Sequence, residues 1–118
     1  MGRAIIQGEV FSGSGEGSKY LGLSWVRKQI KEKLGFFPYP GTLNIKVDDE
    51  LKLRKMLSEN QSIEILPEKG YCTAKCIMVY VGGVKCAIII PEVDGYPGNV
   101  MEIIAPVSLR EKLGLKDG

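Results

Sequence analysis

Histidine is absent from this chain of 118 residues. Its absence excludes Ser-His and Cys-His catalytic triads and metal sites that use an imidazole ligand. The three cysteines, Cys72, Cys76 and Cys86, are too few for an intrachain zinc site with its usual four Cys or His ligands. We expect them to be small buried side chains, with a redox pair of Cys72 and Cys76 as the alternative. Any catalysis must therefore rest on carboxylates, hydroxyls, amides, cations and the backbone.

Long hydrophobic runs and a strong excess of one charge are also missing. No apolar run approaches the roughly 20 residues of a membrane span, and the first residues, MGRAII, do not continue into the apolar core of a signal peptide. The formal net charge of +2 does not indicate a nucleic-acid partner, which usually requires a concentrated basic face. The basic run VRKQIKEK is interrupted by Glu32 and has helical spacing, which predicts a solvated helix face. We expect a cytoplasmic monomer that binds neither a membrane nor a nucleic acid.

Residues 1–118 are expected to form one domain, because the chain is too short for two ordinary domains and 44% of it is hydrophobic. Apolar alternation predicts strands over 4–11, 42–47, 62–66 and 100–106, and two further β-rich runs within 71–91 that meet at a Gly82-Gly83 hairpin turn. Helices are predicted over 23–35, with Ser24 as a cap and Gly35 as the stop, and over 48–59 and 108–115. Because this order has no regular βαβ rhythm, it predicts a mainly β fold, a small closed β-barrel with short helices.

Three glycines alternate in the stretch SGSGEGSKY, residues 12–20, directly after the first predicted strand. Glycine-rich loops after strands often wrap phosphates, because a backbone without Cβ can aim several N–H groups at one anion. The spacing matches neither the Walker motif, which ends in GK[ST], nor the dinucleotide pattern G-x-G-x-x-G. By its spacing alone, the stretch is either a phosphate-binding loop or a tight bend between a strand and a helix.

The stretch PYPGTLN, residues 38–44, carries two polar side chains on either side of Leu43. In an extended segment Thr42 and Asn44 point to one face while Leu43 points into the core. A hydroxyl and an amide carbonyl on one face can supply hard oxygen ligands to Mg²⁺, which completes its shell from phosphates and water. The alternative is that Thr42 and Asn44 only initiate a turn.

Glu102 stands in the otherwise apolar run VMEIIAP. Alternation places its neighbours on the opposite face, so this carboxylate either faces solvent or serves in a pocket as a general base or hydroxyl acceptor. The residues that follow, APVSLRE, place Ser108 and Arg110 at the start of a helix, where backbone N–H groups and a guanidinium can both bind an anion. An exposed surface cation is the alternative for Arg110.

Together, the stretches GEVFSGSGEG, LGFFPYPGTLN and MEIIAPVSLREKLGLKDG resemble the CTP-dependent riboflavin kinases of archaea. They occur in order over nearly the full length of the chain. The resemblance implies a six-stranded cradle-loop barrel. It also implies transfer of the γ-phosphoryl group of CTP to the 5′-hydroxyl of riboflavin, which yields FMN and CDP.

The resemblance also assigns roles to individual residues. Around the phosphates and cytidine of the nucleotide it places Gly13, Ser14, Gly15, Glu16, Gly17 and Ser18. The resemblance assigns Thr42 and Asn44 as ligands of Mg²⁺. It assigns Glu102 as the catalytic residue, which contacts the reacting hydroxyl of the flavin. Further nucleotide contacts, chiefly to cytosine, are implied for Ser108, Leu109, Arg110 and Glu111. For Glu16 a sugar hydroxyl, a base amine and Lys19 remain open as partners.

Two features depart from the family pattern. Relatives often carry a threonine that contacts the flavin phosphate, whereas the loop PEVDGYPGN places Asp94 at this flavin-binding position. Either this loop has a different register or the product is bound more weakly. Relatives also usually continue with a last strand after LKDG, so we expect a barrel that lacks this strand within residues 1–118. The alternative to a kinase is a non-catalytic barrel that senses flavin or nucleotide, or that binds DNA.

Overall fold

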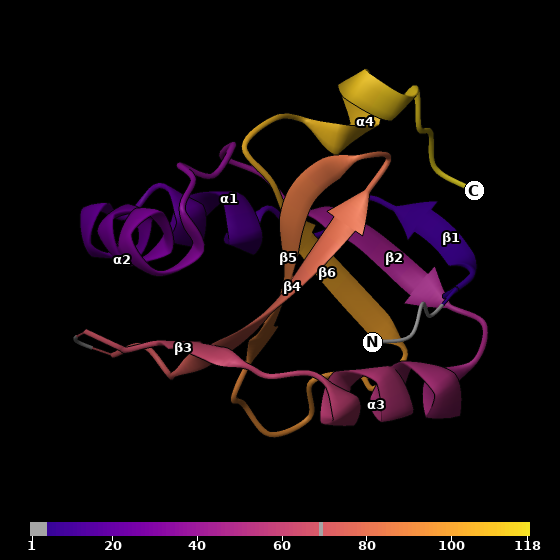
Figure 1. Ribbon diagram of the computed structural model, residues 1–118, viewed down its shortest axis with the longest axis horizontal. Helices are drawn as coiled ribbons and strands as arrows, with labels where there is room; N and C mark the ends of the chain where they lie inside the picture. The colour runs from indigo at the N-terminus through magenta and orange to yellow at the C-terminus, as the bar shows by residue number, and fades with distance from the viewer. Residues whose placement is uncertain (1–4, 69) are drawn as a thin grey trace.

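The computed structural model describes residues 5–68 and 70–118. Strands dominate this part of the chain, with short helices between them (Figure 1). The elements follow in the order β1 (Gly8–Phe11), α1 (Glu16–Leu21), α2 (Ser24–Leu34), β2 (Leu43–Val47), α3 (Glu50–Glu59), β3 (Ile63–Ile65), β4 (Ala74–Val81), β5 (Val84–Pro91), β6 (Val100–Ile104) and α4 (Leu109–Leu113). The predicted mainly β fold with six strands and short helices is confirmed.

The strands form one antiparallel sheet in the order β1-β2-β6-β5-β4-β3. In the described part of the chain β1 and β3 are the two edges and do not pair with each other, so the sheet is barrel-like but open, in contrast to the closed barrel predicted from the pattern of strands. All six strands precede α4, and no strand follows it among residues 5–68 and 70–118. The tail after α4 lies against the edge of β1, where the N–H of Gly118 donates to the carbonyl of Val10 at 2.9 Å.

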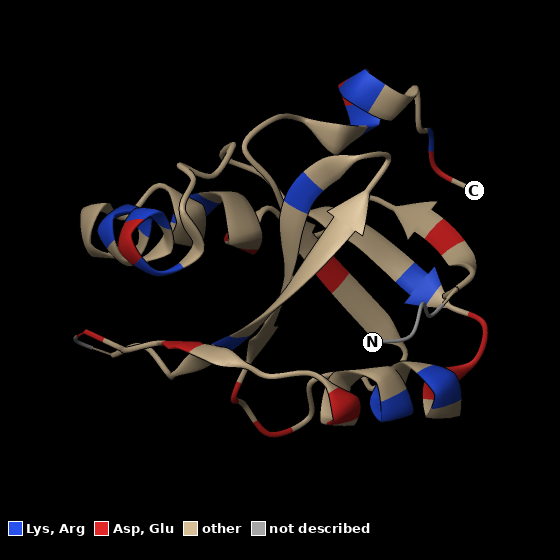
Figure 2. Cartoon of the chain, viewed as in Figure 1, with Lys and Arg blue, Asp and Glu red and all other residues tan. Residues whose placement is uncertain are grey.

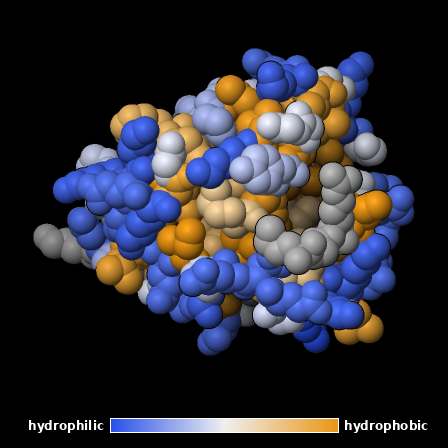
Figure 3. Space-filling model, in the orientation of Figure 1, coloured by the Kyte–Doolittle hydropathy of each residue, from blue (hydrophilic) through white to orange (hydrophobic). Residues whose placement is uncertain are grey.

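Both faces of the sheet are buried, as alternate residues of β5 show. Ala87 and Ile89 belong to one core cluster, which α1 and α2 cover with Leu21, Val26, Ile30 and Leu34. Cys86 and Ile88 belong to the other cluster, which includes Leu53 of α3 and Leu109 of α4. In Figure 1, α1 and α2 accordingly lie together at one side, while α3 and α4 lie below and above the sheet. On the molecular surface seen in this orientation, Figure 3 shows apolar side chains near the middle and many hydrophilic ones around them.

The cysteines are free and mostly buried, as expected. Cys76 on β4 and Cys86 on β5 are fully buried, one in each core cluster, and Cys72 lies partly exposed before β4. Burial raises the pKa of Cys76 to about 12. A thiol held neutral in this way packs as a small apolar side chain.

The basic run on α2 is a solvated helix face, as predicted. Lys28, Lys31, Glu32 and Lys33 are exposed, and Figure 2 shows blue and red residues side by side on this helix. Among the described residues, no helix has both the length and the apolar character that a membrane crossing requires.

Helix ends agree with the sequence in part. Gly35 ends α2 with φ 88°, and Ser108 caps α4 by accepting a hydrogen bond from the N–H of Glu111, both as predicted. Ser24 was expected to cap α2, but the cap residue is Leu23 and no side chain there accepts a hydrogen bond. Ser24 is instead the first residue inside the helix.

The first strand and the glycine stretch differ from expectation. Strand β1 begins only at Gly8, and residue 4, where the predicted strand begins, lies outside the described residues. The glycine stretch is not a loop throughout, because α1 begins at Glu16. Gly15 turns the chain into this helix with φ 87°, a left-handed conformation that glycine adopts without strain, and Glu16 suits the first turn of a helix. Without an apolar period of its own, so short a helix leaves little signal in the sequence.

Candidate functional site

Two adjoining cavities lie beside the glycine stretch. The first, the glycine cavity, has a volume of about 210 Å³ and is lined by Ser12, Gly13, Ser14, Gly15, Gly17, Ser18, Gly41, Thr42, Asn44, Glu102 and Arg110. The second, the aromatic cavity, has a volume of about 560 Å³ and is lined among others by Glu16, Lys19, Tyr20, Tyr71, Cys72, Ile89, Val93 and Tyr96. Ser14, Gly17, Thr42 and Glu102 line both. The structure therefore brings the predicted metal pair, the predicted base and the glycine stretch together at the boundary of two cavities.

The register of the sheet explains this meeting. Asn44 of β2 lies opposite Phe11 of β1 on one side and opposite Glu102 of β6 on the other. Directly opposed residues of antiparallel strands have neighbouring side chains on the same face. Strand β1 leads directly into the glycine stretch, so three segments that are distant in sequence reach one point of the sheet.

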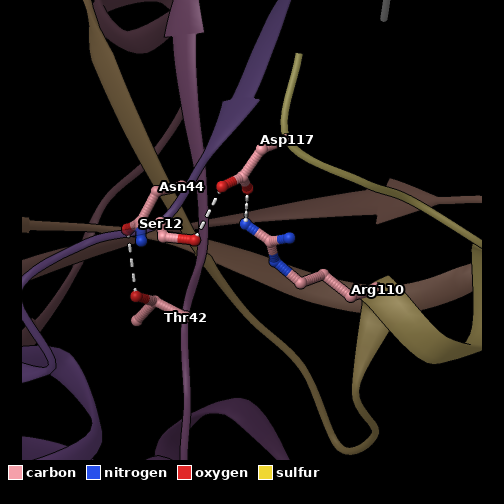
Figure 4. A network of polar contacts seen from close by, with 5 residues as sticks. All are labelled: Ser12, Thr42, Asn44, Arg110 and Asp117. Carbon is pink, nitrogen blue, oxygen red and sulfur yellow. Dashed lines mark hydrogen bonds and ion pairs between the residues drawn. The ribbon is translucent and has the colours of Figure 1, made fainter.

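Asn44 is 7% exposed and is the one buried polar or charged residue in the described part of the chain. In one orientation of its amide, the Thr42 hydroxyl donates to Asn44 Oδ1 at 3.1 Å (Figure 4). With the amide turned over, Oδ1 accepts from the N–H of Gly13 at 3.1 Å, and the nitrogen donates to Thr42 Oγ1 at 3.1 Å and to Glu102 Oε1 at 3.3 Å. In the second orientation both the oxygen and the nitrogen of the Asn44 amide have hydrogen-bond partners within the protein. The first points the hydroxyl and carbonyl oxygens of the pair toward each other and toward a carboxylate, which is the donor set that a hard divalent cation prefers.

Two of the alternate glycines lie too close to neighbouring side chains to carry a Cβ, and the third has a backbone conformation that favours glycine. A Cβ added to Gly13 would lie 2.5 Å from Asn44 Nδ2, and one added to Gly17 would lie 2.9 Å from Thr42 Oγ1. Gly15 has open space around it but a φ of 87°. The stretch therefore wraps the Thr42–Asn44 pair closely, and this packing is more than a bend requires.

Glu102 is half-buried, and its carboxylate accepts a hydrogen bond at Oε2 from the hydroxyl of Tyr96 at 3.1 Å. Burial raises the pKa of Glu102, and the hydrogen bond from Tyr96 partly opposes this shift. Burial also raises the pKa of Tyr96, with a further contribution from the Glu102 charge, so the phenol stays protonated as a donor. The exposed-carboxylate alternative for Glu102 is therefore wrong.

Tyr96 is a site residue that sequence reasoning missed. It lies in the loop PEVDGYPGN, in which the family pattern indicates Asp94 as the flavin-binding residue. Asp94 is exposed and lines none of the cavities described here. A single aromatic residue between glycines and prolines is the one available signal, and it does not indicate that the ring returns to Glu102.

Around Arg110, a third, smaller cavity of about 140 Å³ lies between Tyr39, Gly41 and the start of α4. Ser108, Leu109 and Arg110 line it, and Arg110 also lines the glycine cavity. Leu109 is only 4% exposed and packs into the core. Glu111, the fourth residue expected here, lines none of the three cavities.

Two of the aromatic residues that line the aromatic cavity belong to a ring cluster. The rings of Tyr20 and Tyr71, which line the cavity, lie 6.1 Å apart between centroids, and Trp25 meets them edge-on at 5.9 Å and 5.4 Å. The buried hydroxyl of Tyr20 has no hydrogen-bond partner, and burial raises the pKa of Tyr20 to about 12. An apolar, aromatic cavity of this kind suits a flat, largely apolar ligand with polar edges.

Glu16 and Lys19 of α1 both line the aromatic cavity. No ion pair joins them among the described residues. Of the partners considered for Glu16, Lys19 is therefore not engaged, and the carboxylate is free to meet a ligand group.

Comparison with protein families matches residues 10–118 to the family CTP-dep_RFKase, described as "Domain of unknown function DUF120". The chain is similar to the riboflavin kinase of Archaeoglobus fulgidus, with 45% identity over 99% of this chain and 52% of the relative. It is similar to that of Methanocella arvoryzae, with 42% identity over 99% of this chain and 55% of the relative. It is also similar to that of Pyrobaculum aerophilum, with 44% identity over 94% of this chain and 55% of the relative. The chain thus spans about half the length of the relatives it matches.

Proposed function

The chain belongs to the CTP-dep_RFKase family, and from this membership and the site we propose that it is a CTP-dependent riboflavin kinase. The reaction transfers the γ-phosphoryl group of CTP to the 5′-hydroxyl of riboflavin and yields FMN and CDP. The observation that carries the proposal is the placement of Thr42, Asn44 and Glu102 at the boundary of a glycine-lined cavity and an aromatic cavity. Phosphoryl transfer needs this arrangement, with a nucleotide and an acceptor on either side of a positioned carboxylate.

The nucleotide phosphates belong in the glycine cavity. Its lining has backbone from Gly13, Gly15 and Gly17, hydroxyls from Ser14 and Ser18, and the guanidinium of Arg110. Exposed N–H groups, hydroxyls and a guanidinium are the groups that bind phosphate oxygens. The cytosine ring belongs beside Ser108, Leu109 and Arg110, where the smaller cavity of about 140 Å³ favours a one-ring base over a two-ring purine.

Riboflavin belongs in the aromatic cavity. Tyr20 and Tyr71 offer ring contacts for the isoalloxazine, and the ribityl chain runs from them toward Glu102. Asp94 is outside the cavity lining, so the flavin role that the family pattern assigns to its position falls instead to neighbours in the same loop, Val93 and Tyr96, which do line the cavity.

The donor set fits Mg²⁺. Thr42 Oγ1 and Asn44 Oδ1 lie 3.1 Å apart, and Glu102 faces the same amide. Hydroxyl and carbonyl oxygens suit this hard cation, which takes few protein ligands when phosphates are present. When bound there, Mg²⁺ neutralises charge on the phosphates and orients them for in-line transfer.

Glu102 orients the 5′-hydroxyl and accepts its proton as transfer proceeds. Its burial raises the pKa toward the working range of a general base, while Tyr96 holds Oε2 and leaves Oε1 to the substrate side. In the amide orientation in which the Thr42 hydroxyl donates to Asn44 Oδ1, Asn44 does not donate to Glu102, and Glu102 Oε1 is available to the substrate hydroxyl.

A matrix of the four nucleoside triphosphates with riboflavin, each with and without Mg²⁺, tests the proposal by the FMN formed. We expect FMN with CTP and Mg²⁺, and at least about tenfold less with ATP or GTP, because a site that hydrogen-bonds one base leaves polar groups unpaired with another. Equal rates with ATP would reject the choice of CTP. Binding of riboflavin and CDP without turnover would instead favour a non-catalytic sensing barrel.

A further inference from the structure

Asp117 hydrogen-bonds to two parts of the nucleotide site, Ser12 at the start of the glycine stretch and Arg110 on α4 (Figure 4). Its Oδ2 accepts a hydrogen bond at 2.9 Å from the hydroxyl of Ser12, the residue that opens the glycine stretch. Its Oδ1 pairs at 2.5 Å with Nη2 of Arg110 on α4. One carboxylate therefore spans the glycine stretch and the cation of the same cavity.

The backbone holds this carboxylate in place from both sides. The N–H of Leu115 donates to the carbonyl of Arg110 at 2.9 Å, and Leu115 packs against the second core cluster. One residue beyond Asp117, the N–H of Gly118 donates to Val10 of β1 at 2.9 Å. The tail is thus tied to both α4 and β1, and this backbone path places the Asp117 side chain between Ser12 and Arg110.

Asp117 holds two groups, the glycine stretch and the Arg110 side chain, that otherwise lose much conformational freedom when a ligand binds. The glycine stretch has three residues without side chains, and the Gly13 N–H donates to Asn44 only when the Asn44 amide is turned over. Arg110 is the single Lys or Arg among the described residues that line the glycine cavity, and its side chain is 34% exposed. Ordering a long side chain and a glycine segment on binding costs conformational entropy, so fixing both beforehand strengthens binding.

Asp117 could also act against an anion, by competing with phosphates for Arg110. The geometry favours the opposite effect. A guanidinium has five N–H donors, and the recorded contact with Asp117 uses one nitrogen, so donors remain for a phosphate. We propose, building on the proposed function, that Asp117 is a positioning residue that clamps Ser12 to Arg110 and so preorganises the nucleotide cavity.

The test compares wild-type protein with Asp117→Asn, Ser12→Ala, Arg110→Ala and the Asp117→Asn/Arg110→Ala double variant. We expect Asp117→Asn to raise the KM and the Kd for CTP about three- to fivefold, the upper range for a partly exposed ion pair, with kcat and the KM for riboflavin within about twofold. Ser12→Ala should act in the same direction. In the Arg110→Ala background, Asp117→Asn should have little further effect, because the clamp has already lost its partner. Glu59→Gln, an exposed helix carboxylate that pairs with Lys55 on α3, is the matched control and should match wild type.

The outcomes are distinct. Tighter CTP binding by Asp117→Asn would show that Asp117 competes with phosphate, and unchanged CTP binding would reduce it to a surface ion pair; either result overturns the proposal. Independent, additive effects in the double variant would also overturn it. Thermal unfolding of each variant separates these results from loss of fold. If wild-type protein binds CTP but forms no FMN, the kinase proposal fails alone, and the dissociation constants of the variants still decide the clamp.

Discussion

At the scale of single residues, Glu102 combines a cost in folding stability with a proposed role in catalysis. It is a half-buried carboxylate whose pKa is raised by burial, so its ionised form is less stable in the folded protein than in water. The same carboxylate lies beside Thr42 and Asn44, where the proposed proton transfer would take place. A residue that costs stability and lies in a cavity is typical of a functional site.

Replacing Glu102 with glutamine should therefore separate activity from stability. We expect kcat to fall by about a hundredfold or more, as for loss of a general base, with the KM for CTP within about twofold. Because glutamine is neutral and still accepts a hydrogen bond from Tyr96, the unfolding temperature should stay the same or rise. The measurements are steady-state kinetics of FMN formation and thermal unfolding. Glu92→Gln, which removes an exposed carboxylate paired with Lys75 at 3.1 Å, should change neither kinetic constant; an unaffected kcat in the Glu102 variant would reject the base role.

Single residues also show where sequence reasoning about the site stops. Thr42 and Asn44 could be paired from alternation alone, since they lie two residues apart on one strand face. Their meeting with Glu102 depends on the β2–β6 register, and the role of Tyr96 depends on how its loop folds back. Those contacts are non-local, so only the resemblance to a family could suggest the first, and nothing in the sequence indicated the second.

At the scale of elements, local patterns predicted most of the structure. Gly35 ends α2, the Gly82-Gly83 turn joins β4 to β5, and Ser108 caps α4, each through a local backbone rule. Helix α1 was missed because a glycine with positive φ starts it and it has no apolar period. The strand order β1-β2-β6-β5-β4-β3 could not be read from the chain, because β6 inserts between β2 and β5 by long-range pairing.

The β4–β5 hairpin allows a test of the rule that a type I′ turn favours residues able to adopt a positive φ. Gly82 and Gly83 have φ values of 56° and 80°, as a type I′ turn requires at both central positions. A Cβ on Gly83 would meet no atom within 4 Å, so Gly83→Ala changes backbone preference alone. We expect a loss of about 1 kcal/mol in the free energy of unfolding, with Gly83→Asn losing less because asparagine tolerates the left-handed region. Denaturant unfolding with an unchanged m-value would measure this, and a fully neutral Gly83→Ala would show that the turn relaxes without cost.

At the scale of the whole molecule, Asn44 and Glu102 lie on the neighbouring strands β2 and β6 of an open, barrel-like sheet whose two faces are buried. Different helices line different cavities. Helix α1 forms a wall of the aromatic cavity, and the start of α4 forms a wall of the small cavity. Thr42 lines all three cavities, so the candidate ligand spaces adjoin at this residue. A transfer reaction between two ligands needs this kind of shared boundary.

The ring cluster beside the aromatic cavity contains a fluorescent residue that can report ligand binding. Trp25 is the single tryptophan of the chain, and its ring lies 5.4 Å from that of Tyr71, which lines the cavity. Riboflavin bound there should quench Trp25 emission, and the titration gives a Kd without any turnover. Tyr71→Ala should weaken riboflavin binding by about three- to tenfold, the contribution of one aromatic contact, and leave CTP binding within about twofold. Tyr80→Ala removes a tyrosine that is 73% exposed on β4 and serves as the matched control. Equal riboflavin affinity in the Tyr71 and Tyr80 variants would place the flavin outside the aromatic cavity.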